Sequence, residues 1–351
     1  MGENSPNYLN SQTTFLSNKM LLRSAVVGLG KSGSLFDEES RKVTWSHAGA
    51  YLGLPDQYCL VGGSDLLDEN RARFQLRCPD AKVFSEATEM MSTLRPDVLS
   101  ICTPPQGRAE LVEKLLAVHR PKVLICEKPL EISSEARKNL VACCSRYEVP
   151  LVVNYNRRYS SVYRCLRSSI EENKLGLLTG ITILTPNRLW SMGSHALNLL
   201  FYLAGEYPQK WTCLPIPFLQ EEGEPACDFL CRFPSGAVGR VLTSGFKETL
   251  IFEVDILGTQ GRIRSTGNGD AAYQQKLINS DEFTNYRVMG PETLLTADGS
   301  QESTFINIVR ETAEVVAGVK NISSNGEDAL MSEDILDSMS LEFGGDFKNG
   351  Y

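Results

Sequence analysis

The stretch AVVGLGKSG, residues 25–33, decides the fold of the first half of this chain. It places Gly28, Gly30 and Gly33 in G-x-G-x-x-G spacing directly after a short apolar run, with Leu29 between the first two glycines. Where a strand turns into a helix, such glycines permit the tight turn, the approach of a pyrophosphate to the backbone, and close helix packing. The free N–H groups at the helix start favour phosphate. The stretch predicts a dinucleotide-binding loop, with a loop that binds no ligand as the alternative.

Further apolar runs follow this loop and alternate with segments that have helical spacing. The runs are YCLVGGSD (58–65), PDVLSICTPP (96–105), KVLICEKPL (122–130) and VPLVVNYN (149–156). Nearly continuous apolar strands that alternate with helices indicate a parallel sheet covered on both faces. We therefore expect a doubly wound α/β domain, a Rossmann fold, over residues 21–153.

The pattern changes after residue 153 to longer strands with more alternation. Examples are LLTGITILT (177–185), ACDFLCRFPSGAVGRVLTSG (226–245) and TLIFEVDILGTQGRIRSTG (249–267). Alternation with turn signals between the strands predicts an α+β domain with a mostly antiparallel open sheet, over residues 154–345. An uncovered sheet face favours a homodimer or homotetramer through it. Residues 1–20 are polar and are expected to be a disordered tail.

Composition excludes several classes of partner. The chain has 351 residues with 35 Lys and Arg against 43 Asp and Glu, a net charge of -8, and no basic cluster. Nucleic acid and anionic membrane are therefore not expected as partners. No apolar run reaches the roughly 18 residues of a membrane span, and no signal peptide is recognisable, so we expect a cytoplasmic protein. The 10 cysteines form no C-x-x-C pair and the 3 histidines no ligand motif, so we expect no metal.

Asp65 ends the second apolar run. A carboxylate at this place accepts hydrogen bonds from ribose hydroxyls and repels a 2′-phosphate, which favours NAD over NADP. Its separation from Gly33 exceeds the usual spacing of about 20 residues. The excess lies in SLFDEESRKVTW, residues 34–45, which is either a lid near the nicotinamide or an ordinary surface loop.

Two later strand ends carry the residues that we expect to meet the nicotinamide, because ligands of open parallel sheets bind beyond the carboxyl ends of the strands. Thr103 and Pro104 follow one strand and are expected beside the nicotinamide ribose. Glu127 and Lys128 follow the next strand. An ammonium there can donate a hydrogen bond to a substrate oxygen as negative charge grows on it. A surface lysine neutralised by Glu127 is the alternative.

The order of several motifs resembles the Gfo/Idh/MocA family of oxidoreductases, which act largely on sugars, inositols and nucleotide-linked sugars. The motifs are AVVGLGKSG, SICTPP, CEKPL, NYNRRY, GSHALNLLFYLAGE and EVDILGTQGRIR, which together span nearly everything after the tail. The E-K-P element is the most specific, and the family often holds its Lys-Pro bond cis. The resemblance implies an NAD-dependent dehydrogenase or reductase of CH–OH groups, in which Lys128 contacts the substrate.

The resemblance also implies that His195 is the catalytic acid/base. A histidine can exchange a proton near neutral pH. The family pattern is D-x-G-x-H-x-x-D, and here Ser191 and Asn198 replace the two acids. Without a carboxylate neighbour the imidazole is less readily protonated and less well oriented. A histidine of the core is the alternative. A second departure is Arg108, where the family often has histidine.

Polar and aromatic residues of the second half are expected to contact the substrate: Asn156, Arg157, Arg158, Trp190, Ser191 and Asn198, with Tyr155, Asn187 and Arg188 as further candidates. An arginine in the cleft would suit a phosphate or carboxylate, and an ordinary salt bridge is the alternative. Our first functional hypothesis is hydride transfer between NAD and a secondary alcohol or ketone of a sugar, inositol or nucleotide sugar. The second is a catalytically inactive nucleotide-binding sensor or regulatory protein, which the replaced acids motivate.

Overall fold

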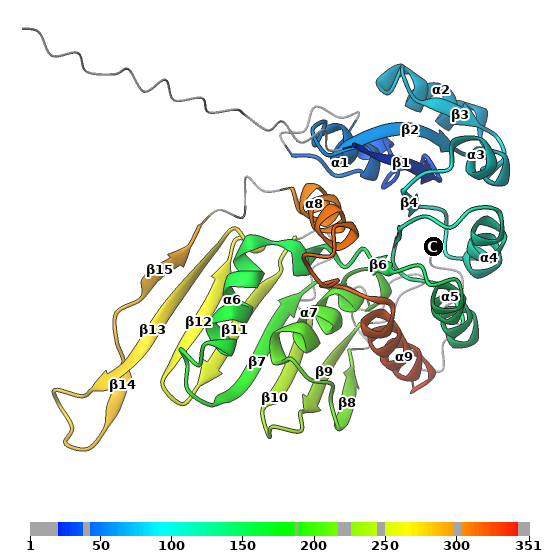
Figure 1. Ribbon diagram of the computed structural model, residues 1–351. Coiled ribbons are helices and arrows are strands. Elements are labelled where there is room, and N and C mark those ends of the chain that lie inside the picture. Colours follow the sequence, from blue (N-terminus) through cyan, green and yellow to red (C-terminus); the bar gives the residue numbers. More distant parts are fainter. Residues whose placement is uncertain are drawn as a thin grey trace, which may run out of the picture.

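The computed structural model describes residues 20–37, 43–186, 189–216, 226–243, 250–297, 299 and 303–342. Residues 1–19 of the expected tail and the candidates Asn187 and Arg188 lie outside these ranges. Two sheets and the helices packed on them make up the described chain (Figure 1). No helix among the described residues is long and apolar enough to cross a membrane.

The first sheet is parallel throughout, with strand order β3-β2-β1-β4-β5-β6. Its strands are β1 (Leu22–Val27), β2 (Tyr58–Ser64), β3 (Lys82–Phe84), β4 (Val98–Ile101), β5 (Val123–Cys126) and β6 (Leu151–Val153). The connecting helices are α1 (His47–Leu52), α2 (Asp68–Arg77), α3 (Ala87–Leu94), α4 (Arg108–Val118) and α5 (Ser134–Arg146). All residues of β4 and β5 are buried, as continuous apolar strands covered on both faces require. The predicted Rossmann architecture is confirmed.

The helix after the glycine loop is split by the inserted segment. A turn at 31–34 follows the loop, and the N–H of Ser34 donates to the carbonyl of Gly30, as in a first helical turn. The N–H groups of His47 and Ala48 then donate to the carbonyls of residues 32 and 33. These are helical i to i−4 bonds if residues 35–45 are looped out. The insertion, which includes the 3-10 turn η1 (Leu35–Asp37), therefore leaves a helix and rejoins it beside the cofactor loop.

The second sheet has nine strands in the described part of the chain, in the order β14-β13-β12-β11-β7-β10-β9-β8, with β15 beside β13. These are β7 (Leu178–Thr185), β8 (Lys210–Pro215), β9 (Cys227–Arg232), β10 (Val238–Thr243), β11 (Glu253–Gly258), β12 (Gly261–Thr266), β13 (Ala271–Asn279), β14 (Arg287–Met289) and β15 (Thr293–Thr296). Only the β7–β10 pair is parallel, which confirms the mostly antiparallel prediction. Helices α6 (Ser161–Glu171) and α7 (Ser194–Ala204) pack on it, and the β13–β14 hairpin projects away from the molecule (Figure 1).

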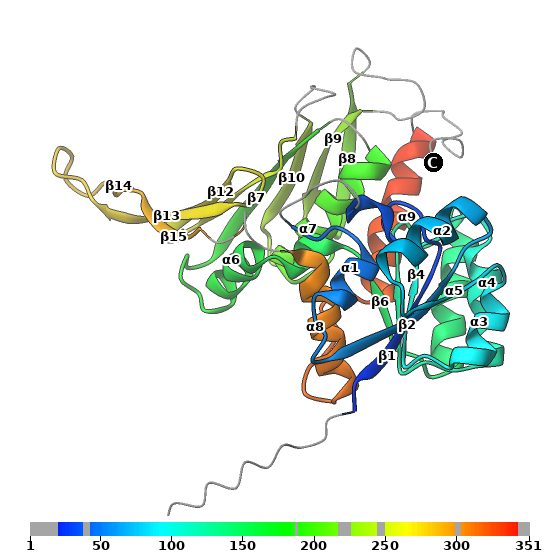
Figure 2. The ribbon, with the colours of Figure 1, turned by 90° about the horizontal axis from the view of Figure 1, so that it is seen from above.

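Two C-terminal helices return from the second sheet to the first, as Figure 2 shows from above. Phe305, Ile308 and Val309 of α8 (Thr304–Val316) share one core cluster with Val26 and Leu29 of the first domain. The expected division into 21–153 and 154–345 is contiguous in sequence and does not anticipate this return. It brings residues from the end of the chain to the edge of the predicted cofactor cleft.

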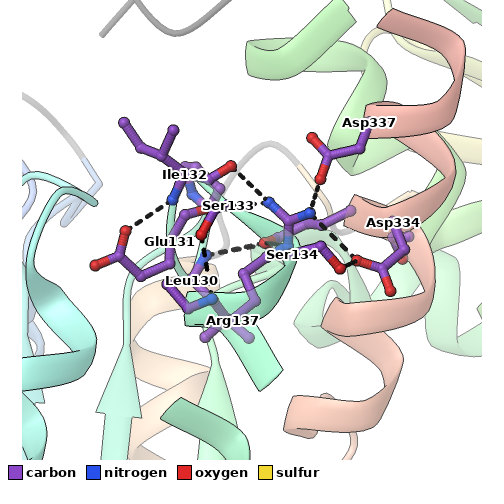
Figure 3. Close-up of polar contacts among 12 residues, drawn as sticks. Leu130, Glu131, Ile132, Ser133, Ser134, Arg137, Asp334 and Asp337 are labelled. Atoms are coloured by element: carbon purple, nitrogen blue, oxygen red, sulfur yellow. Dashed lines mark hydrogen bonds and ion pairs between the residues drawn. The ribbon is translucent and has the colours of Figure 1, made fainter. Parts of the chain in front are cut away.

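Helix α9 (Gly326–Glu342) is held to α5 by a buried arginine (Figure 3). Arg137 is fully buried, and its guanidinium pairs with Glu333, Asp334 and Asp337 of α9. Its Nη1 also donates to the carbonyls of residues 131 and 132. A buried cation needs such multiple partners, because an unpaired charge in the interior is costly. The network fixes α9 against the segment that follows β5.

Candidate active site

The glycine loop has the geometry that a dinucleotide requires. Gly28 has φ 87, and a Cβ on it would lie 2.7 Å from the backbone of Cys102 and Thr103. A Cβ on Gly33 would lie 1.9 Å from the carbonyl oxygen of Gly28, so helix and loop touch there. A Cβ on Gly30 would meet no atom within 4 Å, which leaves open space above its backbone. This is the space into which a pyrophosphate fits.

Asp65 lies directly beside this loop, at the end of β2. Its carboxylate accepts hydrogen bonds from the backbone N–H of Leu29 at 2.7 Å, from that of Leu67 at 2.9 Å and from the Asn70 amide at 3.1 Å. The side chain is therefore fixed next to the glycine loop, where a ribose would extend from a bound pyrophosphate. The residues present fit NAD, as the sequence predicted.

Arg108 ties the two strand-end segments together. It is buried at the start of α4, and its guanidinium donates to the carbonyl oxygens of Thr103, Glu127 (2.5 Å), Pro129 and Leu130 (3.3 Å). Carbonyls that point into the protein need such donors. The arginine that departs from the family's histidine thus holds the backbone around Lys128.

Thr103 and Pro104 follow β4 at the expected place. Thr103 is half-buried, its backbone N adjoins Gly28, and its side-chain oxygen has no hydrogen-bond partner among the described residues. Pro104 is exposed. Both lie next to the cofactor loop, on the side to which the strands point.

Glu127 is anchored by two side chains that the sequence did not single out. Nε2 of His47 lies 3.1 Å from its carboxylate, and the Asn154 amide donates to the same carboxylate at 2.7 Å. Burial opposes ionisation of Glu127, but these hydrogen bonds and the nearby ammonium of Lys128 outweigh it and lower the pKa of the carboxyl. Glu127 is thus a fixed anion at the base of the cleft.

Lys128 reaches across to the second half of the molecule. Its Nζ donates to the backbone carbonyl of Ser191 at 3.0 Å, and the Lys128–Pro129 peptide bond is cis. The N–H of Leu130 donates to the carboxylate of Glu333 on α9, at 3.1 and 3.2 Å to its two oxygens. The loop is therefore held by Arg108 on its carbonyl side and by Glu333 on its N–H side. The ammonium stands at a fixed place between the two halves.

A cavity of about 220 Å³ brings Lys128 and His195 together. Both residues line it, although one follows β5 and the other begins α7. Its remaining lining residues are Ser32, Phe36, Trp45, Glu127, Asn154, Asn156 and Phe305. We refer to this cavity as the reaction cleft. The inserted segment contributes the aromatic side chains of Phe36 and Trp45 to it, and the choice between a lid and an ordinary surface loop stays a prediction.

His195 follows a π-helical turn, η3 (Leu189–Gly193), at the second position of α7. Its ring lies edge-on to Tyr155, with centroids 5.7 Å apart. Its Nδ1 is buried and has no hydrogen-bond partner among the described residues. Burial, together with the positive charges of Lys128 and Arg157, lowers the pKa of His195 well below its ordinary value. The imidazole is therefore neutral at pH 7 and able to accept a proton.

Tyr155 connects His195 to α9. Its hydroxyl donates to Glu333 at 2.8 Å. Burial raises the pKa of Glu333 to about 7, against the opposing charge of Arg137. Tyr155, a candidate for substrate contact in the sequence, thus bonds to Glu333 and does not line the reaction cleft. Glu333 gave no signal in the sequence, because only the fold brings α9 to β6.

Two residues expected at the substrate lie in a structural network instead. Arg158 is 3% exposed, and its guanidinium pairs with Asp328 of α9 at 2.7 Å. Its Nε donates to the side-chain oxygen of Asn198 at 2.6 Å, and the Asn198 amide donates to Ser332 at 3.0 Å. Neither Arg158 nor Asn198 lines the reaction cleft. They join α7 to α9, and this placement lends no support to the predicted substrate contact.

Trp190 is also turned inward. Its Nε1 donates to Ser340 of α9 at 3.2 Å, and the ring is 7% exposed in the core of the second domain. It therefore lies in the core and not in the lining of the reaction cleft, so its position lends no support to the predicted substrate contact. Ser191 contributes its backbone carbonyl to Lys128, and Asn156 lines the reaction cleft as expected. Among the described residues there is no group of three or more histidine, cysteine or acidic side chains that could hold a metal ion.

Comparison with known proteins agrees with this geometry. Residues 22–155 match the family described as "Oxidoreductase family, NAD-binding Rossmann fold", GFO_IDH_MocA. The chain is 21% identical over 263 residues to a myo-inositol 2-dehydrogenase of Thermotoga maritima, covering 69% of this chain and 74% of the relative. It is 24% identical over 285 residues to a D-apiose dehydrogenase of Paraburkholderia graminis, covering 74% of this chain and 72% of that relative.

Solved structures share the fold over almost the whole chain. An oxidoreductase from Agrobacterium radiobacter, in complex with NAD+, L-tartaric acid and magnesium, superposes with a TM-score of 0.74 at 16% identity, covering 95% of this chain and 98% of that one. The WlbA dehydrogenase from Bordetella pertussis, in complex with NADH and UDP-GlcNAcA, gives 0.70 at 17% identity, with the same coverage of 95% and 98%. The cofactor loop and the cis Lys128–Pro129 peptide lie within residues 22–155, the part of the chain that matches the Gfo/Idh/MocA family of NAD-binding oxidoreductases.

Proposed function

We propose that this protein transfers a hydride between NAD and a secondary alcohol or ketone of a sugar, an inositol or a nucleotide sugar. The observation that carries the proposal is the reaction cleft, in which an ammonium from the nucleotide-binding domain and an imidazole from the second domain line the same cavity. When bound, NAD supplies the hydride acceptor or donor. The residues of this chain then have to position the alcohol and move its proton.

His195 is the proposed base in the oxidation direction. Its lowered pKa keeps the imidazole neutral at pH 7, so one ring nitrogen is available to take the hydroxyl proton of the substrate. Proton transfer to a positioned side chain accelerates such reactions by about 10²- to 10⁴-fold. In the reduction direction the same ring returns the proton to the carbonyl oxygen.

Lys128 is the proposed electrostatic partner. Its ammonium can donate a hydrogen bond to the substrate oxygen as negative charge develops there. Its loop is fixed by Arg108 and Glu333, so little rearrangement is needed when the substrate arrives. Asn156, in the wall of the reaction cleft, is proposed to bind a substrate hydroxyl.

The relatives support a class of substrate and not one particular compound. The two relatives compared above are named as dehydrogenases of myo-inositol and D-apiose, and one of the similar solved structures is a complex with UDP-GlcNAcA. We therefore propose a polyhydroxylated ring or its ketone as substrate. The replacement of two family acids by Ser191 and Asn198 favours a second candidate, a nucleotide-binding sensor without turnover.

One experiment separates the two functions. The purified protein is incubated with NAD and a panel of inositols, free sugars and nucleotide sugars, and formation of NADH is followed by absorbance. Turnover of at least one compound that is lost in Lys128→Ala supports the dehydrogenase. Tight NAD binding without turnover of any member supports the sensor.

We also propose that copies of the chain associate through the face of the second sheet opposite α6 and α7. Large apolar side chains are exposed on β8 to β11, namely Leu214, Leu230, Leu242 and Leu257. They alternate with buried neighbours along their strands. A homodimer or homotetramer that covers them is the expected state, and light scattering during gel filtration measures it. We place the protein in the cytoplasm, a reducing compartment that suits its free cysteines.

A further inference from the structure

A second cavity adjoins the reaction cleft. It has a volume of about 400 Å³ and shares the lining residues Trp45 and Asn156 with the cleft. Arg157 lines this second cavity, which we call the arginine cavity, together with Tyr163, Phe252 and Asp270. Asn156 and Arg157 are consecutive in the short helix η2 (Asn156–Tyr159), so one turn of chain serves both cavities.

Arg157 differs from its neighbour Arg158 in what surrounds its charge. Arg158 pairs with Asp328, whereas Arg157 forms no ion pair or hydrogen bond within the described residues. Its guanidinium lies over the ring of Phe252, 3.7 Å from the centroid. Burial lowers the pKa of Arg157 to about 10. A half-buried cation without an anionic partner is unfavourable, and an anion that enters the cavity relieves this cost.

The geometry of Arg157 suits an anion better than a neutral hydroxyl. A guanidinium that stacks on an aromatic ring is held in plane, with its N–H groups free to point along the edge. Carboxylate and phosphate accept two parallel hydrogen bonds from that edge, which makes such pairs short and strong. Asp270 lines the same cavity but forms no ion pair with Arg157 in the described part of the chain, so it does not neutralise the guanidinium.

We propose that Arg157 binds a carboxylate or phosphoryl group of the substrate while the reacting carbon lies in the reaction cleft between Lys128 and His195. The inference rests on the proposed function and deepens it: the substrate is an acidic sugar derivative, such as a uronate or a sugar phosphate. Trp45, 37% exposed and present in both cavities, covers the sugar ring between the two ends.

The test is a binding measurement on the full-length protein saturated with NADH. D-glucose, D-glucuronate and D-glucose 6-phosphate are titrated by calorimetry, so the ring is constant and the anionic group varies. We expect at least one anion to bind about tenfold or more tightly than glucose, as a paired anion should. Which of the two binds more tightly distinguishes the carboxylate from the phosphoryl group. The Arg157→Met variant should bind the anions and glucose with about equal affinity.

Arg120→Met is the matched control. Arg120 also lies over an aromatic ring, 5.2 Å from the centroid of Tyr147, but it is exposed and lines neither cavity. The two variants lose the same charge and the same kind of ring contact, and Arg120→Met should keep the full preference. If Arg157→Met melts below the assay temperature, Arg157→Lys replaces it. That variant keeps the charge without the paired N–H groups and should still lower the preference several-fold.

Two results would overturn the inference. One is that neither anion binds wild type more tightly than glucose. The other is that the Arg157 variant still binds an anion more tightly than glucose, by the same factor as wild type. The affinity of the protein for NADH is measured first, by NADH fluorescence. This measurement distinguishes a failure of the inference about Arg157 from a failure of the proposed function. A wild-type protein that does not bind NADH contradicts the proposed function itself, whereas normal NADH binding without anion preference contradicts only the role of Arg157.

Discussion

The two sides of the reaction cleft are built differently. On the nucleotide side, Glu127 is fixed by His47 and Asn154, and the loop of Lys128 by a buried arginine and a buried glutamate. On the other side, Nδ1 of His195 has no hydrogen-bond partner in the described structure. Hydrogen-bonded groups are oriented before a ligand arrives. The cofactor side is therefore preorganised, whereas the orientation of the imidazole is left to the substrate.

His195→Asn removes the functional group of the second side and has the largest expected effect. We expect kcat/KM for alcohol oxidation to fall by about 10²- to 10⁴-fold, because the proton acceptor is lost. NADH affinity, which depends on the other side, should not change. In wild type the base is protonated only below its lowered pKa, so activity should persist from pH 7 to well below pH 6.5. Steady-state kinetics over pH measures both effects, and a loss of less than tenfold would count against His195 as the base.

Lys128→Met tests the preorganised side. Removal of the ammonium should lower kcat/KM by about 10²- to 10³-fold, the range for loss of one donor to a developing oxyanion. Lys122→Met is the matched control, since Lys122 stands just before the same strand, β5, and pairs with Asp97 at 3.0 Å outside the cleft. Its activity should stay within twofold of wild type. Equal losses in the two variants would show that stability, not chemistry, is affected.

Ser191→Asp returns an acid to the position where the D-x-G-x-H-x-x-D pattern has one. A carboxylate near His195 favours the imidazolium and so raises the pKa of the ring. The acidic limb of the pH–rate profile should move to higher pH, with kcat changed by roughly tenfold or less. An unchanged profile would mean that the new carboxylate does not reach the imidazole. Ser191→Asn, similar in size and uncharged, is the control.

Glu333→Gln has the smallest expected effect and concerns stability. The pKa of Glu333 is about 7 in the folded protein, above the ordinary value of 4.5. The folded state therefore binds more protons between these values, and wild-type stability should decrease as pH rises from about 4.5 to 7. The variant should lose this component of the pH dependence, on the order of 1 kcal/mol or more. Melting temperatures from pH 5 to 8 measure this component, with Asp334→Asn on the same helix as control. If the melting temperatures of wild type and Glu333→Gln change with pH in parallel, the prediction is contradicted.

What the sequence predicted well is governed by local chain geometry. Gly28, Gly30 and Gly33 are needed where the backbone turns tightly and approaches its neighbours, so their spacing directly after an apolar strand predicted the loop. Lys128 was found because a buried strand delivers it to a known edge of the sheet. Such features depend on a few neighbouring residues.

What the sequence could not predict depends on distant segments. Arg157 and Arg158 are adjacent, yet Arg157 lines the arginine cavity and Arg158 pairs with Asp328, because successive residues of a helical turn point in different directions. Trp190 points inward because Ser340 of α9 lies there. His47 and Glu127 are 80 residues apart in the sequence, and only the fold brings them into contact. No local pattern records such contacts.

The return of the C-terminal segment has a consequence for biosynthesis. The N–H of Val153 on β6 donates to the carbonyl of Ser324, and Val152 bridges to Asn325. A ribosome therefore releases the nucleotide-binding half long before the residues that cover its last strand and its apolar flank. The nascent half-protein presents an open strand edge, the kind of surface that chaperones protect. Premature termination before Ser324 would leave that edge permanently uncovered.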